Sequence, residues 1–145
     1  RSAFRTSWSP AIVDCQPSLG LLTVNALAAA HGVVIPLTAE FFALRAVALL
    51  TETIDKVQER INPALHIDGV VATMYDQRTL HAREVLGRLD EAFGDKLFET
   101  VIRRTVKFPD ATVAAEPITS FAPQHAGAAA YRRLAQELIA RGGAP

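Results

Sequence analysis

Short apolar runs alternate with longer amphipathic stretches along the chain. The apolar runs predict buried strands at residues 11–13, 33–35, 67–74 and 97–102. In the stretches between and after them, apolar positions recur at helical spacing, which predicts helices over residues 19–30, 40–61, 78–93 and 124–140. Residues 108–123 contain three prolines, which exclude a long helix, so we expect irregular structure there.

Strands separated by helices of this length predict an α/β fold. A helix that joins two neighbouring strands of one sheet forms a right-handed crossover, so the strands run parallel and helices cover both faces. Half of the 145 residues are hydrophobic and 21% are charged, as in an ordinary globular domain. The apolar stretch at residues 21–37 contains Asn25, His31 and Pro36, so we expect no membrane span.

The overall charge excludes a strong general attraction to nucleic acid. Fifteen basic residues balance fifteen acidic ones, although residues 78–145 hold ten Lys and Arg against eight Asp and Glu. The single cysteine, Cys15, excludes an intrachain disulfide, which is typical of a reducing compartment such as the cytoplasm. The carboxyl-terminal helix carries too few cations for a membrane-surface helix of the kind found in MinD-like regulators.

Asp14 is the first candidate for chemistry, because it follows the apolar run at residues 11–13. A carboxylate at the carboxyl end of a parallel strand lies where such sheets bind ligands, and it could help to hold Mg²⁺ in a nucleotide-hydrolysing enzyme. Two other interpretations stay open. Asp14 could be the phosphate acceptor of a receiver domain, or it could cap the following helix. A receiver domain predicts an acidic pair near the first strand, which this sequence lacks.

An ordered set of segments carries a resemblance to a known family. Residues 14–27 read DCQPSLGLLTVNAL, and further matching segments lie at residues 34–37, 40–44, 73–79, 93–102, 116–118 and 126–131. This series resembles the ParA family of chromosome- and plasmid-partitioning ATPases, whose switch II segment usually reads DCPPSLGLLTxNAL. The matches run in order from about residue 11 to residue 140. The resemblance implies an incomplete P-loop NTPase-like layer of parallel strands flanked by helices.

The resemblance also implies a nucleotide site that uses ATP and Mg²⁺. Asp14 would be the Walker B residue, catalytic and magnesium-binding. Further cofactor contacts would come from Gln16, Pro17 and Gly20 in switch II, and from Pro109 and Asp110 in a segment near the adenine. Gln16 stands where the family usually has proline. No K-G-G-x-G-K-[ST] loop occurs in the sequence, so we expect that the chain alone does not hydrolyse ATP.

DNA contacts follow from the same resemblance. Arg78 and Lys107 match basic positions that contact DNA phosphates in the family, and Arg103 and Arg104 complete an acid-free cluster with Lys107. Such contacts are salt-sensitive and carry no sequence information; the alternative is that these are ordinary solvated side chains. The family implies a homodimer around ATP, non-specific DNA, a ParB-type protein as partner, and a cytoplasmic, nucleoid-associated location.

The first ten residues do not resemble the family. We therefore expect three parts: a non-family segment at residues 1–10, the carboxyl-terminal part of a ParA-type ATPase domain at residues 11–141, and a tail at residues 142–145. This division predicts a truncated or frame-shifted product with an exposed core edge. The alternative function is a non-catalytic DNA-binding or interaction module that retains only the basic surface.

Overall fold

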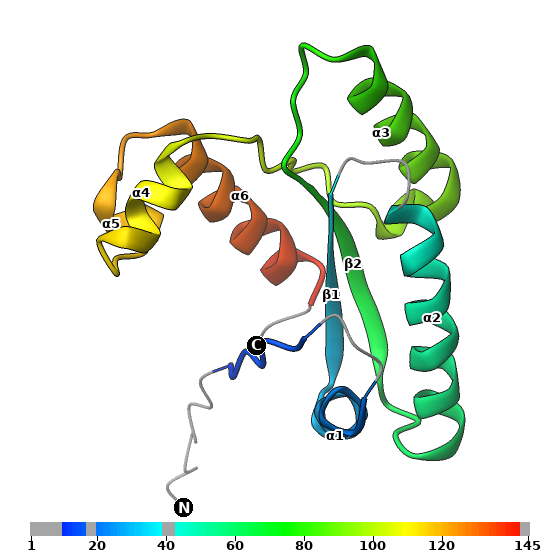
Figure 1. The fold of residues 1–145 in the computed structure, drawn as a ribbon. Coiled ribbons are helices and arrows are strands. Elements are labelled where there is room, and N and C mark those ends of the chain that lie inside the picture. Colours follow the sequence, from blue (N-terminus) through cyan, green and yellow to red (C-terminus); the bar gives the residue numbers. More distant parts are fainter. Residues whose placement is uncertain (1–9, 17–19, 39–42, 143–145) are drawn as a thin grey trace, which may run out of the picture.

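The computed structural model describes residues 10–16, 20–38 and 43–142, and it has an α/β fold. Two parallel strands, β1 (Gly32–Thr38) and β2 (His66–Thr73), form the sheet. The long helices are α1 (Leu21–Ala29), α2 (Ala43–Arg60), α3 (Leu80–Phe93) and α6 (Ala126–Ala140). Figure 1 shows α2 and α3 on one side of the strands and α6 on the other, as the parallel-sheet prediction requires.

Alternation along β2 divides the core into two clusters. Val70 and Ala72 pack with buried residues of α2 and α3, while Val71 faces Phe98 and α6. The register of the two strands shifts once, between Val33 and Val34. Both faces of β2 are therefore covered, which explains why residues 67–74 read as a continuous apolar run.

The ends of the predicted helices are close to the observed ones. Thr79 caps α3, its side chain accepting a hydrogen bond from the Ala82 amide, and the left-handed Gly94 (φ +48°) ends the helix. A short 3₁₀ turn, Gly94–Lys96, follows. None of the described helices is long and apolar enough to cross a membrane. The proposed division of the chain at residues 10 and 141 stays a prediction.

Two strand predictions are wrong. Residues 11–13 form no strand: they are exposed, with Ile12 95% accessible, and no strand in the described part of the chain pairs with them. Residues 97–102 run parallel to β2 but form no regular strand with it: one isolated bridge joins Val70 to Leu97, and a second, just beyond both segments, joins Tyr75 to Arg103. The segment is bulged at residues 99–101: the amides of Phe98 and Ile102, four residues apart, donate to the carbonyls of Val70 and Ala72, which are two residues apart.

The expectation of irregular structure at residues 108–123 is also wrong in part. Two short helices lie there, α4 (Lys107–Val113) and α5 (Ile118–Phe121). Pro109 is in the first turn of α4, where a missing amide hydrogen costs no helical hydrogen bond. Neither helix is long, as the prolines predicted.

Candidate nucleic-acid interface at the carboxyl end of β2

The chain turns sharply where β2 ends. Met74, the next residue, has a φ of +53° and an exposed side chain, a backbone state that a non-glycine residue rarely adopts without a surrounding constraint. The constraint comes from the neighbouring segment: the Tyr75 amide donates to the Ile102 carbonyl at 3.2 Å, and the Arg104 amide donates to the Tyr75 carbonyl at 3.1 Å. These bonds hold the β2–α3 loop against residues 102–104.

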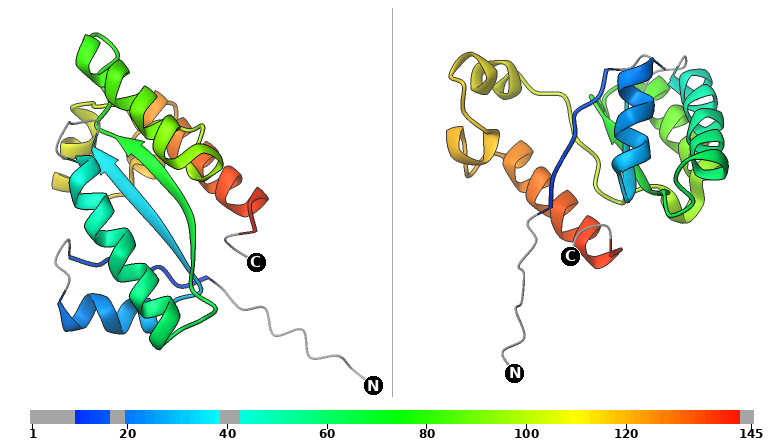
Figure 2. Two further views of the ribbon diagram at one scale, coloured as in Figure 1. Left: turned by 90° about the vertical axis from the view of Figure 1, so that its right-hand side faces the viewer. Right: turned by 90° about the horizontal axis from the view of Figure 1, so that it is seen from below.

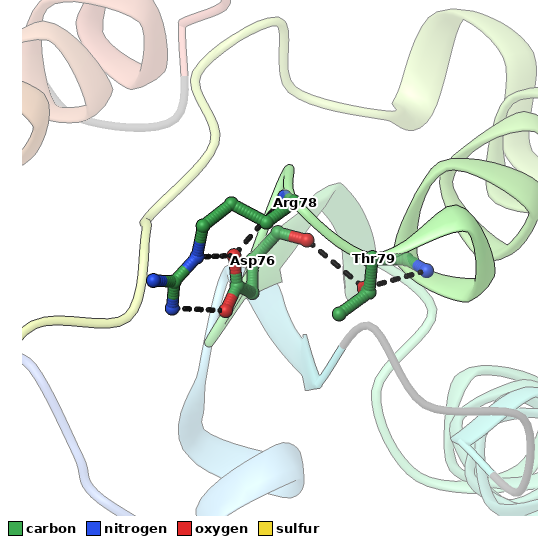
Figure 3. A network of polar contacts seen from close by, with 4 residues as sticks. Asp76, Arg78 and Thr79 are labelled. Atoms are coloured by element: carbon green, nitrogen blue, oxygen red, sulfur yellow. Dashed lines mark hydrogen bonds and ion pairs between the residues drawn. The ribbon is translucent and has the colours of Figure 1, made fainter.

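Asp76 and Arg78 form a closed polar network in this loop (Figure 3). The Arg78 Nε and Nη2 atoms donate to the two carboxylate oxygens of Asp76 at 2.9 and 2.8 Å, and the Arg78 amide donates to Oδ1 at 3.1 Å. The Thr79 hydroxyl donates to the Asp76 carbonyl at 3.0 Å and caps α3. The guanidinium thus folds back onto Asp76, leaving its remaining N–H groups for other acceptors.

This ion pair is charged over the whole physiological pH range. The hydrogen bonds from the Arg78 side chain and amide, together with the positive charges of Arg78 and Arg104, lower the pKa of Asp76 to about 2. The Asp76 carboxylate in turn raises the pKa of Arg78. The Arg78 side chain is 86% exposed, so the pair adds little to stability. The main effect of the ion pair is to offset one positive charge at this surface.

The sheet brings the predicted cations Arg78, Arg103 and Arg104 together; we call these three residues the basic corner. The bridge between Tyr75 and Arg103 sets residues 103–104 beside the β2–α3 loop, and Arg104 is close enough to Asp76 to influence its pKa. Both Arg103 and Arg104 are exposed, and their guanidinium groups make no hydrogen bond or ion pair with another described residue.

Lys107, the fourth predicted cation, begins α4. Its ammonium group lies 3.1 Å from the Asp110 carboxylate, and the side chains of both residues are about half exposed. This pair connects two predictions, because Asp110 was expected near an adenine and Lys107 at DNA. In the structure they neutralise each other at the surface of α4, beside Pro109 in the same helical turn.

The other nucleotide-site candidates lie elsewhere. Asp14 and Gln16 belong to the exposed segment 10–16, and Gly20 precedes α1, where its carbonyl accepts a hydrogen bond from the Val24 amide. Pro17 lies outside the described residues. In Figure 1 and the left view of Figure 2, segment 10–16 (dark blue) lies at the level of the amino-terminal halves of the strands, below their arrowheads.

The described candidates are not joined to one another by direct contacts. No group of three His, Cys, Asp or Glu side chains within residues 10–16, 20–38 and 43–142 could hold a metal ion. No hydrogen bond or ion pair between described residues joins segment 10–16 to α4. The roles assigned to Asp14, Gln16, Gly20, Pro109 and Asp110 therefore stay predictions.

Sequence comparison identifies relatives over most of the chain. The AAA domain family matches residues 3–67. An uncharacterized protein of Mycobacterium tuberculosis is 61% identical over 91% of this chain and 42% of its own length. The chromosome-partitioning ATPase Soj of Treponema pallidum is 49% identical over 91% of this chain and 52% of its own length. The chromosome partitioning protein ParA of Caulobacter vibrioides is 43% identical over 90% of this chain and 49% of its own length. The chain therefore spans about half the length of these relatives.

A solved structure shows the same fold. The cobyrinic acid a,c-diamide synthase of Mycobacterium smegmatis superposes with a TM-score of 0.68 at 37% identity, over 87% of this chain and 44% of that protein. That protein has been crystallised with ADP and magnesium and with an ATP analogue and magnesium. The two strands and their helices are accordingly part of a P-loop NTPase-like fold.

Proposed function

We propose that this chain, which is a homologue of the ParA/Soj partitioning ATPases, forms the DNA-contacting part of such an ATPase. The observation that carries the proposal is the basic corner, in which Arg78, Arg103 and Arg104 from two segments meet at the carboxyl end of β2. In this function the protein dimerises with ATP, binds DNA without sequence preference, and responds to a ParB-type partner at the nucleoid of the cytoplasm.

The chemistry of the corner suits a phosphate backbone. Guanidinium groups donate in a planar fork that matches phosphate oxygens. None of the three residues lies within a helix that could enter a groove and contact base edges. Of the three cations, Arg78 alone has a carboxylate partner among the described residues. The corner thus retains a positive excess, which favours a salt-sensitive, sequence-independent contact.

The nucleotide chemistry of the proposed ATPase involves more than these residues. Asp14 with Gln16, Pro17 and Gly20 would hold Mg²⁺ and the terminal phosphate, and Pro109 with Asp110 would lie near the base. Bound ATP and Mg²⁺ would supply the hydrolysable phosphate and its charge neutralisation. We propose that ATP turnover requires the part of the relatives that this sequence does not span. A fusion of the chain to the amino-terminal half of the Treponema Soj protein should hydrolyse ATP, whereas the chain alone should not. A fusion without turnover would favour the non-catalytic DNA-binding module.

The first test reverses charge in the predicted contact surface. Arg78→Glu and Lys107→Glu should each weaken the retention of a fluorescent duplex, and each should reduce the slope of log K against log salt by about 0.9 or more, because at least one phosphate contact is lost. Fluorescence anisotropy over a salt series measures both quantities.

Arg60→Glu is the matched control for this test. Arg60 is an exposed cation at the end of α2, without an ion pair among the described residues. Its reversal changes the net charge equally but should leave the slope near that of the unmodified chain. Retention that survives both Arg78→Glu and Lys107→Glu would remove the basis of the proposal.

A second test concerns the carboxylate that occupies Arg78. Asp76→Asn keeps the shape of the side chain and removes its negative charge, so the positive charge of Arg78 is no longer offset by its neighbour. The retention of DNA should therefore strengthen, and the salt slope should steepen by up to about 0.9, because the surface gains one net positive charge. Asp55→Asn, at an exposed position of α2, is the control. Weaker binding by Asp76→Asn would instead mean that Asp76 holds Arg78 in its DNA-binding orientation.

A further inference from the structure

An open hollow lies between α6 and the segment at residues 99–105. Its volume is about 870 Å³. One wall is formed by the segment that follows the bulge beside β2, with Arg103 and Arg104, and the other by α6, with Arg133 and Gln136. The buried cluster of Val71, Phe98, Ile102 and Ala130 packs α6 against this segment and β2.

Three arginines line this hollow without partners. Arg103, Arg104 and Arg133 are all exposed, and none makes an ion pair with a residue of the described ranges. Arg132, the neighbour of Arg133 in sequence, behaves differently: its guanidinium donates to the carbonyls of Pro123 and Thr119 and has a structural role. Arg133 is therefore the cation that α6 presents to the hollow.

The other polar groups of the hollow do not cancel this charge. The hollow contains two carboxylates, Glu99 and Glu137. Glu137 accepts hydrogen bonds from two backbone amides and pairs with Arg141, so the charge of Glu99 alone remains to offset three guanidinium groups. At the start of α6 the Gly127 amide already donates to the ring of His125 at 2.9 Å. An anion in the hollow would consequently be bound by the arginine side chains.

We propose that this hollow binds phosphate groups through Arg103, Arg104 and Arg133, and so extends the basic corner onto α6. The guanidinium forks suit phosphate oxygens, and the phosphates could come from a DNA backbone or from a free polyphosphate. The DNA source rests on the proposed function, whereas the free source does not.

The experiment uses the 145-residue chain with two probes. A fluorescent duplex is titrated over a salt series, and sodium tripolyphosphate is titrated by calorimetry. Arg133→Gln, which keeps a helix-forming residue on an exposed face, should reduce the salt slope for DNA by about 0.9 and weaken the binding of tripolyphosphate. Arg104→Gln should do the same, and Arg60→Gln should change neither. Circular dichroism confirms that each variant is folded.

The outcomes separate this proposal from the preceding one. A loss of tripolyphosphate binding with an unchanged DNA slope in Arg133→Gln supports the hollow with free polyphosphate as its ligand. A reduced slope in Arg133→Gln together with normal retention by Arg78→Glu and Lys107→Glu supports the hollow and overturns the proposed contact surface. If Arg133→Gln and Arg104→Gln bind both probes like the unmodified chain, the hollow is not a phosphate site.

Discussion

Replacing Phe98 by alanine should lower the free energy of unfolding by about 3–5 kcal/mol, the usual cost of deleting a buried aromatic ring. Phe98 is 1% exposed and stands at the centre of the cluster between β2 and α6. Gly69 on β2 makes room for the ring, since a Cβ there would come within 2.5 Å of it. On its other side, the Arg141 guanidinium lies 4.3 Å from the ring centroid.

Urea denaturation followed by circular dichroism measures this loss. Val113→Ala is the control, because Val113 is 89% exposed on α4 and its truncation should change the free energy of unfolding by less than about 0.5 kcal/mol. A loss below about 1 kcal/mol for Phe98→Ala would mean that α6 does not pack on the ring. Since α6 carries Arg133, its detachment would also dismantle the proposed phosphate hollow.

The sequence predicted those elements whose signals are local. The β-branched runs at residues 33–35 and 67–74 became β1 and β2, and both strands contribute buried apolar side chains to the core. Thr79 and Gly94 mark the ends of α3 by side-chain capping and by a left-handed turn, which need no distant partner.

The prediction failed where the outcome depends on distant residues. The segment at residues 97–102 is not a regular strand because the amides of Glu99 and Thr100 donate to Glu137 on α6, far along the chain, instead of to β2. The run at residues 11–13 is apolar, yet it found no strand beside it among the described residues. An apolar pattern indicates that a segment can be buried, but whether it is buried in a sheet depends on whether a neighbouring strand pairs with it.

The candidate site was predicted in the same uneven way. The cations Arg78, Arg103 and Arg104 could be named from the sequence. The ion pair between Asp76 and Arg78 was not predicted. The D-x-R spacing before a threonine cap was the available signal, because an Asp that precedes a helix by a few residues commonly bonds to nearby groups. Arg133 gave no signal at all, since only the packing of α6 brings it beside Arg103 and Arg104.

Removing the charge of Glu137 should loosen the attachment of α6 to the sheet. The Glu137 carboxylate accepts hydrogen bonds from the amides of Glu99 (2.7 Å) and Thr100 (3.1 Å) and pairs with Arg141 at 3.0 Å. The Arg141 guanidinium also donates to the carbonyls of Asp95 and Leu97. The Glu137 side chain is 19% exposed, so Glu137→Gln should reduce the free energy of unfolding at pH 7 by about 1.5–3 kcal/mol, because hydrogen bonds to a charged acceptor are weakened.

The pH dependence distinguishes this carboxylate from a merely well-packed side chain. Burial raises the pKa of Glu137, but the hydrogen bonds from Glu99 and Thr100 and the charge of Arg141 lower it more, so the pKa is below its usual value. A carboxyl group with a lowered pKa stabilises the folded state above its unfolded pKa, and this contribution disappears as the pH falls through the folded pKa. The difference between the unmodified chain and Glu137→Gln should therefore be largest at neutral pH and shrink in acid.

Urea denaturation at neutral pH and at several acidic values tests this, with Glu91→Gln at an exposed position of α3 as the equal-charge control. Glu91→Gln should follow the unmodified chain at every pH. A difference for Glu137→Gln that is the same at neutral and acidic pH would show that the charge of Glu137 does not hold α6. The bulge at residues 99–101 would then need another cause, because its amides have no other acceptor among the described residues.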